Sequence, residues 1–220
     1  QVRLHIVEFR GFEKFIQGRP YWEVPVMVQR LCGICPVSHH LAASKALDVI
    51  VGARKLTPAA EKLRRLMHYG QMLQSHALHF FHLCSPDLLF GFDSDVTRRN
   101  IVGVAMAHPE TAKRGVLLRK FGQEVIRVTA GKRVHGTGSV PGGVNKALSI
   151  AERDELLREV YRIVQWSRDA VHLIQKVHMQ DPGLYNSFGI FRSNFMSIVG
   201  NNGDLDFYHG TLRARDDNGR

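Results

Sequence analysis

Two cysteines and a proline fix the local structure of the segment 30–40. Cys32 and Cys35 are separated by two residues, a spacing that lets two thiols hold one metal ion or close a disulfide. Pro36 suits the first turn of a helix, because its missing N–H would have no partner there. Cys35 therefore lies at a helix N-terminus, where the helix dipole favours a thiolate. His39 follows one turn later on the same face, so the segment predicts a soft-metal or redox site.

The Cys-x-x-Cys spacing alone leaves several kinds of site open. A zinc ribbon needs a second cysteine pair, and the third cysteine, Cys84, stands alone in an apolar helical stretch where it reads as a small buried hydrophobe. A thioredoxin-like redox pair belongs between a strand and a helix of a βαβ unit, and no parallel strand is predicted after Cys35. A metal site, a disulfide and a pair without function all remain compatible with the spacing.

Helical periodicity and capping residues predict that the chain is mainly α. Thr57 and Pro58 form a cap and a first-turn proline, which begin a helix that extends to about Cys84. Ser149 and Glu152 form a capping box at the start of another long helix. Helices of this length belong to bundles. The predicted helices are 36–51, 57–84, 109–129 and 149–178, with a loop over 85–100.

The faces of the two longest helices that point to the core are predicted to be apolar. In the first they comprise Leu63, Leu66, Met67, Leu73, Leu78 and Phe81. In the second they comprise Leu156, Leu157, Val160, Ile163, Val164, Val171, Ile174 and Val177.

Short β segments are predicted near both ends of the chain. Val2–Val7 alternates as a strand does, and Phe195–Val199 and Asp204–Tyr208 flank the turn Gly200–Gly203 as a β-hairpin. Leu212–Arg215 would add another strand. The expected fold class is a long-helix bundle with peripheral antiparallel strands. A strand already under way at the start, and a turn signal just before Arg220, predict that residues 1–220 form a single incomplete domain.

Two other clusters carry residue types that bind ligands. His76, His79 and His82 recur every three residues, with His68 nearby, but their surroundings favour packing or a subunit interface over a metal site. The segment 131–143 is rich in glycine, yet it lacks the Gly-Lys-Ser/Thr end of a phosphate loop and follows a helix. Nucleotide binding there is not favoured.

Composition limits the class of protein. The net charge of +10 could indicate nucleic-acid binding, but the basic residues are scattered and not interleaved with aromatics, which favours a solvated or subunit-facing surface. No apolar run reaches the ~20 residues of a membrane span. Three cysteines are too few for a disulfide scaffold and fit a reducing compartment. The basic pairs are Arg64-Arg65, Arg98-Arg99, Lys113-Arg114 and Arg119-Lys120.

A wider set of motifs surrounds the cysteine segment. Arg10-Gly-Phe-Glu13 and Gly18-Arg-Pro precede Arg30-x-Cys-Gly-x-Cys-x-x-x-His39, and this combination resembles the amino-terminal signature of the large subunit of [NiFe] hydrogenases. The particular residues in these motifs are most similar to those of the soluble, NAD-reducing cytoplasmic type. The resemblance continues through His76–Asp87 and Val140-Pro-Gly-Gly143, so it covers the whole chain.

The resemblance implies a function and a set of site residues. The chain would be the amino-terminal portion of a catalytic subunit that splits H2 reversibly and passes electrons through iron–sulfur partner subunits to NAD. Cys32 would be a terminal nickel ligand and Cys35 a bridge between nickel and iron. His39 would donate a hydrogen bond to the bridging sulfur, and Glu13 would help to coordinate Mg²⁺. The glycine-rich segment 131–143 would be a tightly folded loop near the active-site helices.

The resemblance also implies partners and missing parts. Cyanide and carbon monoxide would bind the iron, a small iron–sulfur subunit would contact residues 32–40, and diaphorase subunits would carry the NAD site. A second cysteine pair and an upstream proton-transfer glutamate would lie outside these 220 residues, so the piece alone would be inactive.

Three other readings stay open beside this one. The chain could belong to a hydrogenase that reduces a deazaflavin or NADP. It could resemble the respiratory complex I subunit that keeps the fold without the metal, although Cys32 and Cys35 argue against that. It could also be a basic nucleic-acid-binding module with a structural zinc at the cysteine pair.

Overall fold

The computed structural model describes residues 3, 5, 10–53 and 55–219. It contains two compact units, the first ending at Trp166 and the second beginning at Ser167, and helix α8 (Ile150–Gln180) runs from one into the other. The strand predicted over Val2–Val7 lies outside the described residues, apart from two positions without regular structure.

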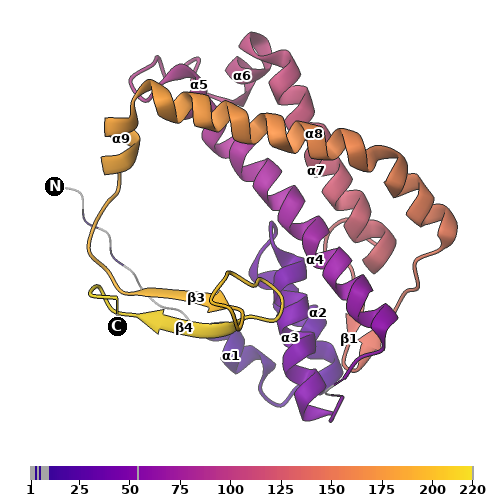
Figure 1. Ribbon diagram of the computed structural model, residues 1–220. Coiled ribbons are helices and arrows are strands. Elements are labelled where there is room, and N and C mark those ends of the chain that lie inside the picture. The colour runs from indigo at the N-terminus through magenta and orange to yellow at the C-terminus, as the bar shows by residue number, and fades with distance from the viewer. Residues whose placement is uncertain (1–2, 4, 6–9, 54, 220) are drawn as a thin grey trace. The chain divides into compact units, whose positions relative to one another are not determined.

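The first unit consists of helices joined by short segments, with one small hairpin (Figure 1). The mainly α prediction is confirmed. Strands β1 (Ser139–Val140) and β2 (Gly143–Val144) pair antiparallel. Together with the first part of α8, the helical elements are α1 (Gly11–Ile16), η1 (Tyr21–Glu23), α2 (Val24–Met27), η2 (Val28–Leu31), α3 (Pro36–Ile50), α4 (Pro58–Leu78), the π-helical η3 (His79–Cys84), α5 (Ser85–Phe90), α6 (Ile101–Ala107) and α7 (Pro109–Ala130).

The two helices that follow the cysteine turn begin where predicted, and the second continues as the π-helical η3 up to the predicted end at Cys84. Cys35 caps α3, and Pro36 is the first residue of that helix. Gly52, just beyond its end, has a φ of +76°, a conformation that glycine adopts without steric cost. Thr57 caps α4, because its hydroxyl accepts a hydrogen bond from the N–H of Ala60 at 3.3 Å.

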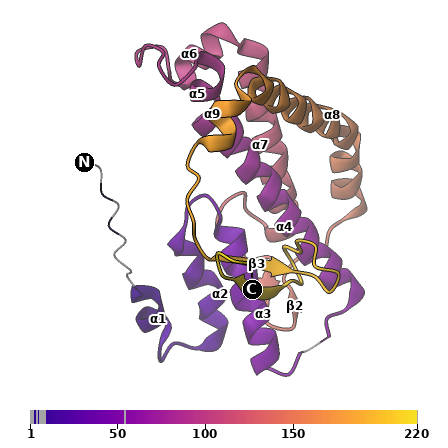
Figure 2. The ribbon, with the colours of Figure 1, turned by 60° about the vertical axis from the view of Figure 1, so that its left-hand side comes forward.

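Helices α4 and α7 lie side by side and antiparallel (Figures 1 and 2). Glycines let their backbones approach closely. A Cβ built on Gly122 would lie 2.6 Å from the carbonyl oxygen of Gly70 and 2.7 Å from the backbone nitrogen of Gln74. Nearer the start of α7, a Cβ on Gly115 would lie 2.4 Å from the side chain of Phe81. The absence of side chains at these positions therefore sets the spacing of the two helices.

The buried face of α4 differs from the apolar face that its leucines predict. Met67 and Phe81 are buried, but the predicted leucines are only half-buried. Arg64, Gln71 and Gln74 occupy the buried face instead. This part of the prediction was wrong because polar side chains at helical spacing find partners on other segments, and those partners are invisible in the sequence.

Residues 85–107 are more helical than predicted. The expected loop over 85–100 begins with α5, and α6 precedes the predicted helix α7. Asn100 caps α6, since its side-chain oxygen accepts hydrogen bonds from the N–H groups of Val102 and Gly103.

Helix α8 begins with the predicted capping box. The N–H of Glu152 donates to the Ser149 hydroxyl at 3.2 Å, and the Glu152 carboxylate accepts from the Ser149 N–H at 3.0 Å. Its predicted apolar stripe is only partly buried. Ile163 and Val177 are buried, whereas Leu157 is 58% exposed, so the described residues cover the stripe incompletely.

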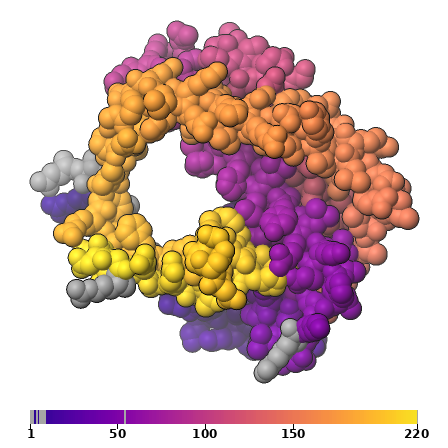
Figure 3. All heavy atoms as spheres, in the orientation of Figure 1, coloured from indigo at the N-terminus to yellow at the C-terminus, as the bar shows by residue number. Residues whose placement is uncertain are grey.

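The second unit contains the rest of α8, a short helix α9 (Pro182–Ser187) and a hairpin of β3 (Phe195–Val199) and β4 (Thr211–Arg215). A hairpin is present, but β3 pairs along its length with 211–215, and its pairing with Asp204–Tyr208 is limited to an isolated bridge between Val199 and Leu205. Asp206 explains the difference, because its carboxylate accepts the N–H groups of Tyr208 and His209 and turns the chain there. The paired strands form a two-stranded sheet. In Figure 3 the residues near the C-terminus, which include β4, are the yellow spheres.

None of the helices in the described part of the chain is both long and apolar enough to cross a bilayer.

The glycine contact between α4 and α7 gives a first prediction. Gly122→Ala should lower the free energy of unfolding of the full-length protein by about 1–3 kcal/mol, because the atoms in the way belong to backbone and cannot turn aside. Urea unfolding measures the change. Gly183→Ala is the control, since its added Cβ would meet no atom nearer than 3.6 Å. Equal effects of the two substitutions would contradict the packing argument.

Candidate metal centre

The sulfur of Cys32 accepts hydrogen bonds from its own turn. The N–H groups of Ile34 and Cys35 both lie 3.3 Å from Sγ. The side chain of Cys35 also donates to this sulfur, and these contacts lower the pKa of the Cys32 thiol below its ordinary value. Cys32 is therefore the more acidic thiol of the pair.

Cys35 has the opposite character. Burial, and then the neighbouring Cys32, raise the pKa of the Cys35 thiol to about 11. The sequence predicted that the helix dipole would favour a thiolate here, and that expectation was wrong because desolvation outweighs the dipole. All three cysteines are free thiols, so the disulfide alternative is not observed.

Two glutamines from α4 hold the backbone between the cysteines. The side-chain amides of Gln71 and Gln74 donate to the carbonyl oxygen of Ile34, at 2.9 Å and 2.7 Å. Both glutamine side chains are buried. The turn is thus anchored on the helix that packs against α7.

His40, on the first turns of α3, ties that helix to the segments before and after it. Its Nε2 accepts the N–H of Ser139 at 3.0 Å, so the proton of the neutral ring lies on Nδ1, which donates to the carbonyl oxygen of Pro25 at 2.7 Å. Burial lowers the pKa of His40. A neutral, fully buried imidazole therefore joins α2, α3 and the glycine-rich loop.

A buried ion pair joins α3 and α4 to that loop. The Arg64 guanidinium donates to both carboxylate oxygens of Asp48, at 2.6 Å and 3.1 Å. It also donates to the carbonyl oxygens of Val140 and Gly143, while the Gly142 N–H donates to Asp48 at 2.7 Å. Arg64 is fully buried, so its assignment to a surface charge pair was wrong. The pairing satisfies almost every polar atom of the guanidinium and explains why the charge can be buried.

The glycine-rich loop also contacts the residue that begins the cysteine motif. The guanidinium of Arg30 lies 3.1 Å from Nδ1 of His135, and His135 has a φ of 54°, in the left-handed region that residues other than glycine rarely adopt. The loop therefore folds against the cysteine segment.

The remaining predicted site residues are less constrained. His39 is half-buried in the first turn of α3, and its hydrogen bond to a metal-bound sulfur stays a prediction. Glu13 is exposed on α1, where an ion pair with Arg10 lowers the pKa of its carboxyl. Its magnesium role also stays a prediction.

The histidine-rich stretch around η3 does not assemble a metal site. Among the residues that the structure describes, no group of three or more His, Cys, Asp or Glu side chains could hold a metal ion. Cys84 lies 3.5 Å from the ring nitrogens of His79 and is half-buried, so it is less enclosed than predicted.

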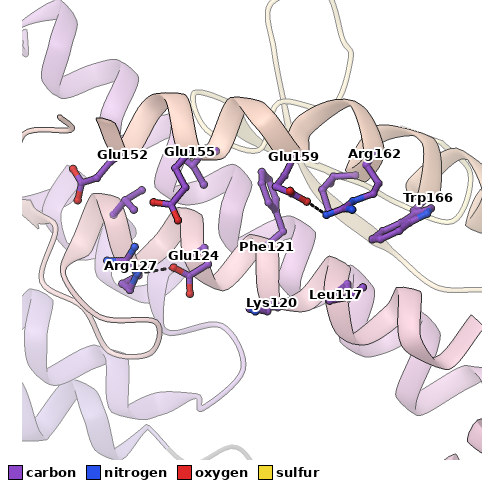
Figure 4. Close-up of a pocket in the computed structure, with 13 residues that line it drawn as sticks. Leu117, Lys120, Phe121, Glu124, Arg127, Glu152, Glu155, Glu159, Arg162 and Trp166 are labelled. Atoms are coloured by element: carbon purple, nitrogen blue, oxygen red, sulfur yellow. Dashed lines mark hydrogen bonds and ion pairs between the residues drawn. The ribbon is translucent and has the colours of Figure 1, made fainter. Parts of the chain in front are cut away.

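A hollow of about 280 Å³ lies between α7 and the first part of α8 (Figure 4). Two of the carboxylates that line it form ion pairs with arginines: Glu124 with Arg127 and Arg133, and Glu159 with Arg162. The hollow contains neither cysteine of the motif. It is a charged groove between two helices and lies apart from the thiol pair.

The donor set of the cysteine turn fits a soft metal ion. Two sulfurs from one turn can bind one ion, and a cation that binds both would displace the proton that Cys35 retains. The backbone N–H groups on Cys32 would remain as donors to a metal-bound sulfur. The pair supplies two ligands, so a four-coordinate site needs further donors.

Sequence reasoning found the two cysteines but missed the residues that hold them. Arg64, Gln71 and Gln74 share one face of α4 with Met67, at helical spacing. Polar side chains in register with a buried methionine are the signal that could have identified them. Their partners on the turn and the loop had no comparable signal.

Comparisons with known proteins identify the family of this chain. The sequence profile described as "Nickel-dependent hydrogenase" matches residues 10–94. The chain is 48% identical to "NAD-reducing hydrogenase HoxS subunit beta" of Cupriavidus necator, over 98% of this chain and 46% of the relative. It is 44% identical to a subunit of the vhu F420-non-reducing hydrogenase of Methanococcus voltae, over 96% and 50%. The chain thus spans about half the length of these curated relatives.

Solved structures show the same fold. An NAD+-reducing [NiFe]-hydrogenase in the H2-reduced state matches 99% of this chain and 48% of its own, with a TM-score of 0.93 and 58% identity. A [NiFeSe]-hydrogenase from Dm. baculatum matches 97% and 47%, with a TM-score of 0.74 at 23% identity, which shows the fold alone. The predicted large-subunit-like fold is confirmed.

The buried ion pair gives a second prediction. Arg64→Met leaves the Asp48 carboxylate without its cation and should lower the free energy of unfolding by about 3–5 kcal/mol. Arg65→Met is the control, because the neighbouring Arg65–Glu61 pair is partly exposed to solvent and should cost less than about 1 kcal/mol. Urea unfolding of both full-length variants compares them. Similar losses of unfolding free energy in the two variants would contradict a larger contribution from the buried pair.

His40 gives a prediction of pH dependence. Its folded pKa lies below the ordinary value of 6.5, so the unfolded chain takes up a proton first as the pH falls. Its contribution to stability is therefore complete above pH 6.5 and declines as the pH falls from there towards the lower folded pKa. Urea midpoints between about pH 7.5 and 5 should drop, and His40→Met should flatten that slope. An unchanged slope in the variant would refute this role.

Proposed function

We propose that this chain, which belongs to the nickel-dependent hydrogenase family, forms the amino-terminal half of the catalytic subunit of a [NiFe] hydrogenase. The complete protein would oxidise H2 reversibly to protons and electrons. The observation that carries the proposal is the turn at Cys32 and Cys35, where two free thiols and two inward N–H groups are held on one carbonyl-anchored loop.

The cysteines would hold half of a nickel–iron centre. Cys32 would bind nickel as a terminal ligand and Cys35 would bridge nickel and iron, with the other thiolates supplied from outside these residues. When bound, the centre would supply the soft, redox-active metals at which H2 is split. Cyanide and carbon monoxide would complete the coordination of the iron. Thiolates suit both metals, whereas harder carboxylates would select others.

The chain's own residues would prepare and tune this site. The N–H groups of Ile34 and Cys35 stabilise negative charge on the Cys32 sulfur. Cys35 keeps its proton until a metal is bound, so assembly would release one proton at this sulfur. His39 would donate a hydrogen bond to the bridging sulfur, and Glu13 would contribute to a magnesium site in the complete protein.

NAD is the electron acceptor that the comparisons favour. The relative from Cupriavidus necator and the solved structure matched at 58% identity are both named as NAD-reducing. A deazaflavin acceptor is less well supported, because the methanogen relative is named as not reducing F420. Electrons would leave through a small iron–sulfur subunit docked near residues 32–40 and reach NAD on diaphorase subunits. We also propose a cytoplasmic location.

The nucleic-acid alternative has weaker support. Many arginines of the basic excess are committed to ion pairs, among them Arg64 with Asp48 and Arg127 with Glu124. Strong, salt-dependent binding of the protein to DNA or RNA would support the nucleic-acid alternative instead.

Replacement of the thiols tests the proposal. In the full-length protein, Cys32→Ser or Cys35→Ser exchanges a soft thiolate for a hard, protonated hydroxyl, so nickel should be absent and H2-dependent NAD reduction lost. His39→Ala should keep nickel and lose about 10–100-fold in rate. Cys84→Ser is the matched control and should retain both metal and activity. Full nickel content together with wild-type H2 oxidation in Cys35→Ser would sink the ligand assignment.

A further inference from the structure

The carbonyl group of Ile34 is saturated by two buried side chains. Gln74 donates to its oxygen at 2.7 Å and Gln71 at 2.9 Å, so both acceptor positions of the carbonyl are filled. Both amides come from one face of α4, three residues apart. Ile34 itself is exposed and lies between the two cysteines of the motif.

This anchoring fixes more than one oxygen. The carbonyl of Ile34 and the N–H of Cys35 belong to the same planar, trans peptide group and point in opposite directions. When the glutamines hold the oxygen on the α4 side, the N–H is directed the other way. That N–H lies 3.3 Å from the sulfur of Cys32. The side chains of α4 thus control a hydrogen bond to sulfur that they do not touch.

We propose that Gln71 and Gln74 are positioning residues that orient the 34–35 peptide group and thereby hold its N–H on the sulfur of Cys32. The inference rests on the proposed function, since it assigns these residues to the metal centre of a hydrogenase. A hydrogen bond to a metal-bound sulfur withdraws electron density from it and fixes the direction of its lone pairs. The glutamines therefore tune the centre from the helix behind the turn.

Stability alone does not explain the amide of Gln71. The side-chain oxygen of Gln71 is buried and has no hydrogen-bond partner among the described residues. A buried acceptor without a partner destabilises the fold, so an apolar side chain of the same length would be the less costly choice. The donated hydrogen bond to Ile34 is what the amide adds.

Gln71 and Gln74, which together we call the clamp, lie on a helix that is itself held in place by its neighbours. The backbone nitrogen of Gln74 faces Gly122 of α7, where a Cβ would lie only 2.7 Å away. Arg64, two turns before Gln71, ties the same helix to α3 through Asp48. The positions of the two amides are thereby fixed relative to the turn.

The test uses the full-length holoenzyme and three variants, Gln71→Met, Gln74→Met and the double substitution. Methionine keeps the length of the side chain and removes the donor. We expect the double variant to lose nickel to EDTA about 10–100-fold faster than wild type, with the single variants between. The electron paramagnetic resonance signal of nickel should shift in the same order. Gln74→Glu, which keeps the shape and places oxygen against the carbonyl, should behave like Gln74→Met.

Thr129→Val is the matched control. It removes a buried hydroxyl that donates to the carbonyl of Val125 on α7, at 2.7 Å, without touching the cysteine turn. Its melting temperature should fall while its nickel signal and nickel retention stay at wild-type values. If Thr129→Val changed the nickel signal as much as the glutamine variants do, the effect would be general destabilisation and the proposal would be wrong.

The outcomes separate this inference from the function on which it rests. Wild-type protein without nickel would overturn the proposed function, and with it the clamp. Wild-type protein with nickel, and a double variant with unchanged retention and an unchanged signal, would overturn the clamp alone. If the double variant does not assemble, the single variants decide the question, because each leaves one donor in place.

Discussion

The guanidinium of Arg64 is the point at which α3, α4 and the glycine-rich loop meet. A charge buried to this degree is stable only when it is paired and its N–H groups are bonded. The carboxylate of Asp48 and two carbonyl groups of the loop meet both conditions. Because the three segments share this one ion, none can shift without leaving a buried charge exposed to an apolar interior. This buried polar cluster therefore stabilises the first unit of the chain alongside its apolar core.

The cysteine turn inherits its geometry from this framework. Glycine contacts fix α4 against α7, and the ion pair fixes α4 against α3. Two glutamines then hold the turn at the carbonyl of Ile34, while His40 ties α3, which follows the turn, to the carbonyl of Pro25 on α2. The metal binding proposed for this turn would benefit from this arrangement, because ligands already in position need little reorganisation on binding. The electronic difference between Cys32 and Cys35 arises in the same place, from N–H groups on one sulfur and burial of the other.

The sequence was sufficient for the parts of this account that depend on local chemistry. The caps at Cys35, Thr57 and Ser149 and the stop at Gly52 were predictable because each uses residues within one helical turn. The motif Arg30-x-Cys-Gly-x-Cys-x-x-x-His39, together with Arg10-Gly-Phe-Glu13 before it, indicated the family. Contacts between distant segments were not predictable, since Arg64 with Val140 and His40 with Ser139 depend on how the helices pack. The strand expected at Asp204–Tyr208 failed for a local reason, the turn imposed by the Asp206 side chain.

Nickel-edge X-ray absorption of the purified full-length protein tests the central claim most directly, because it reports which atoms surround nickel. The account predicts that sulfur atoms dominate the nickel coordination in the wild type. It also predicts that the nickel signal disappears in Cys32→Ser, in which one of these thiolates is gone, and persists unchanged in Cys84→Ser. Nickel bound only by nitrogen and oxygen, or a Cys32→Ser protein with the full sulfur coordination of the wild type, would contradict the assignment of this turn as half of the metal centre.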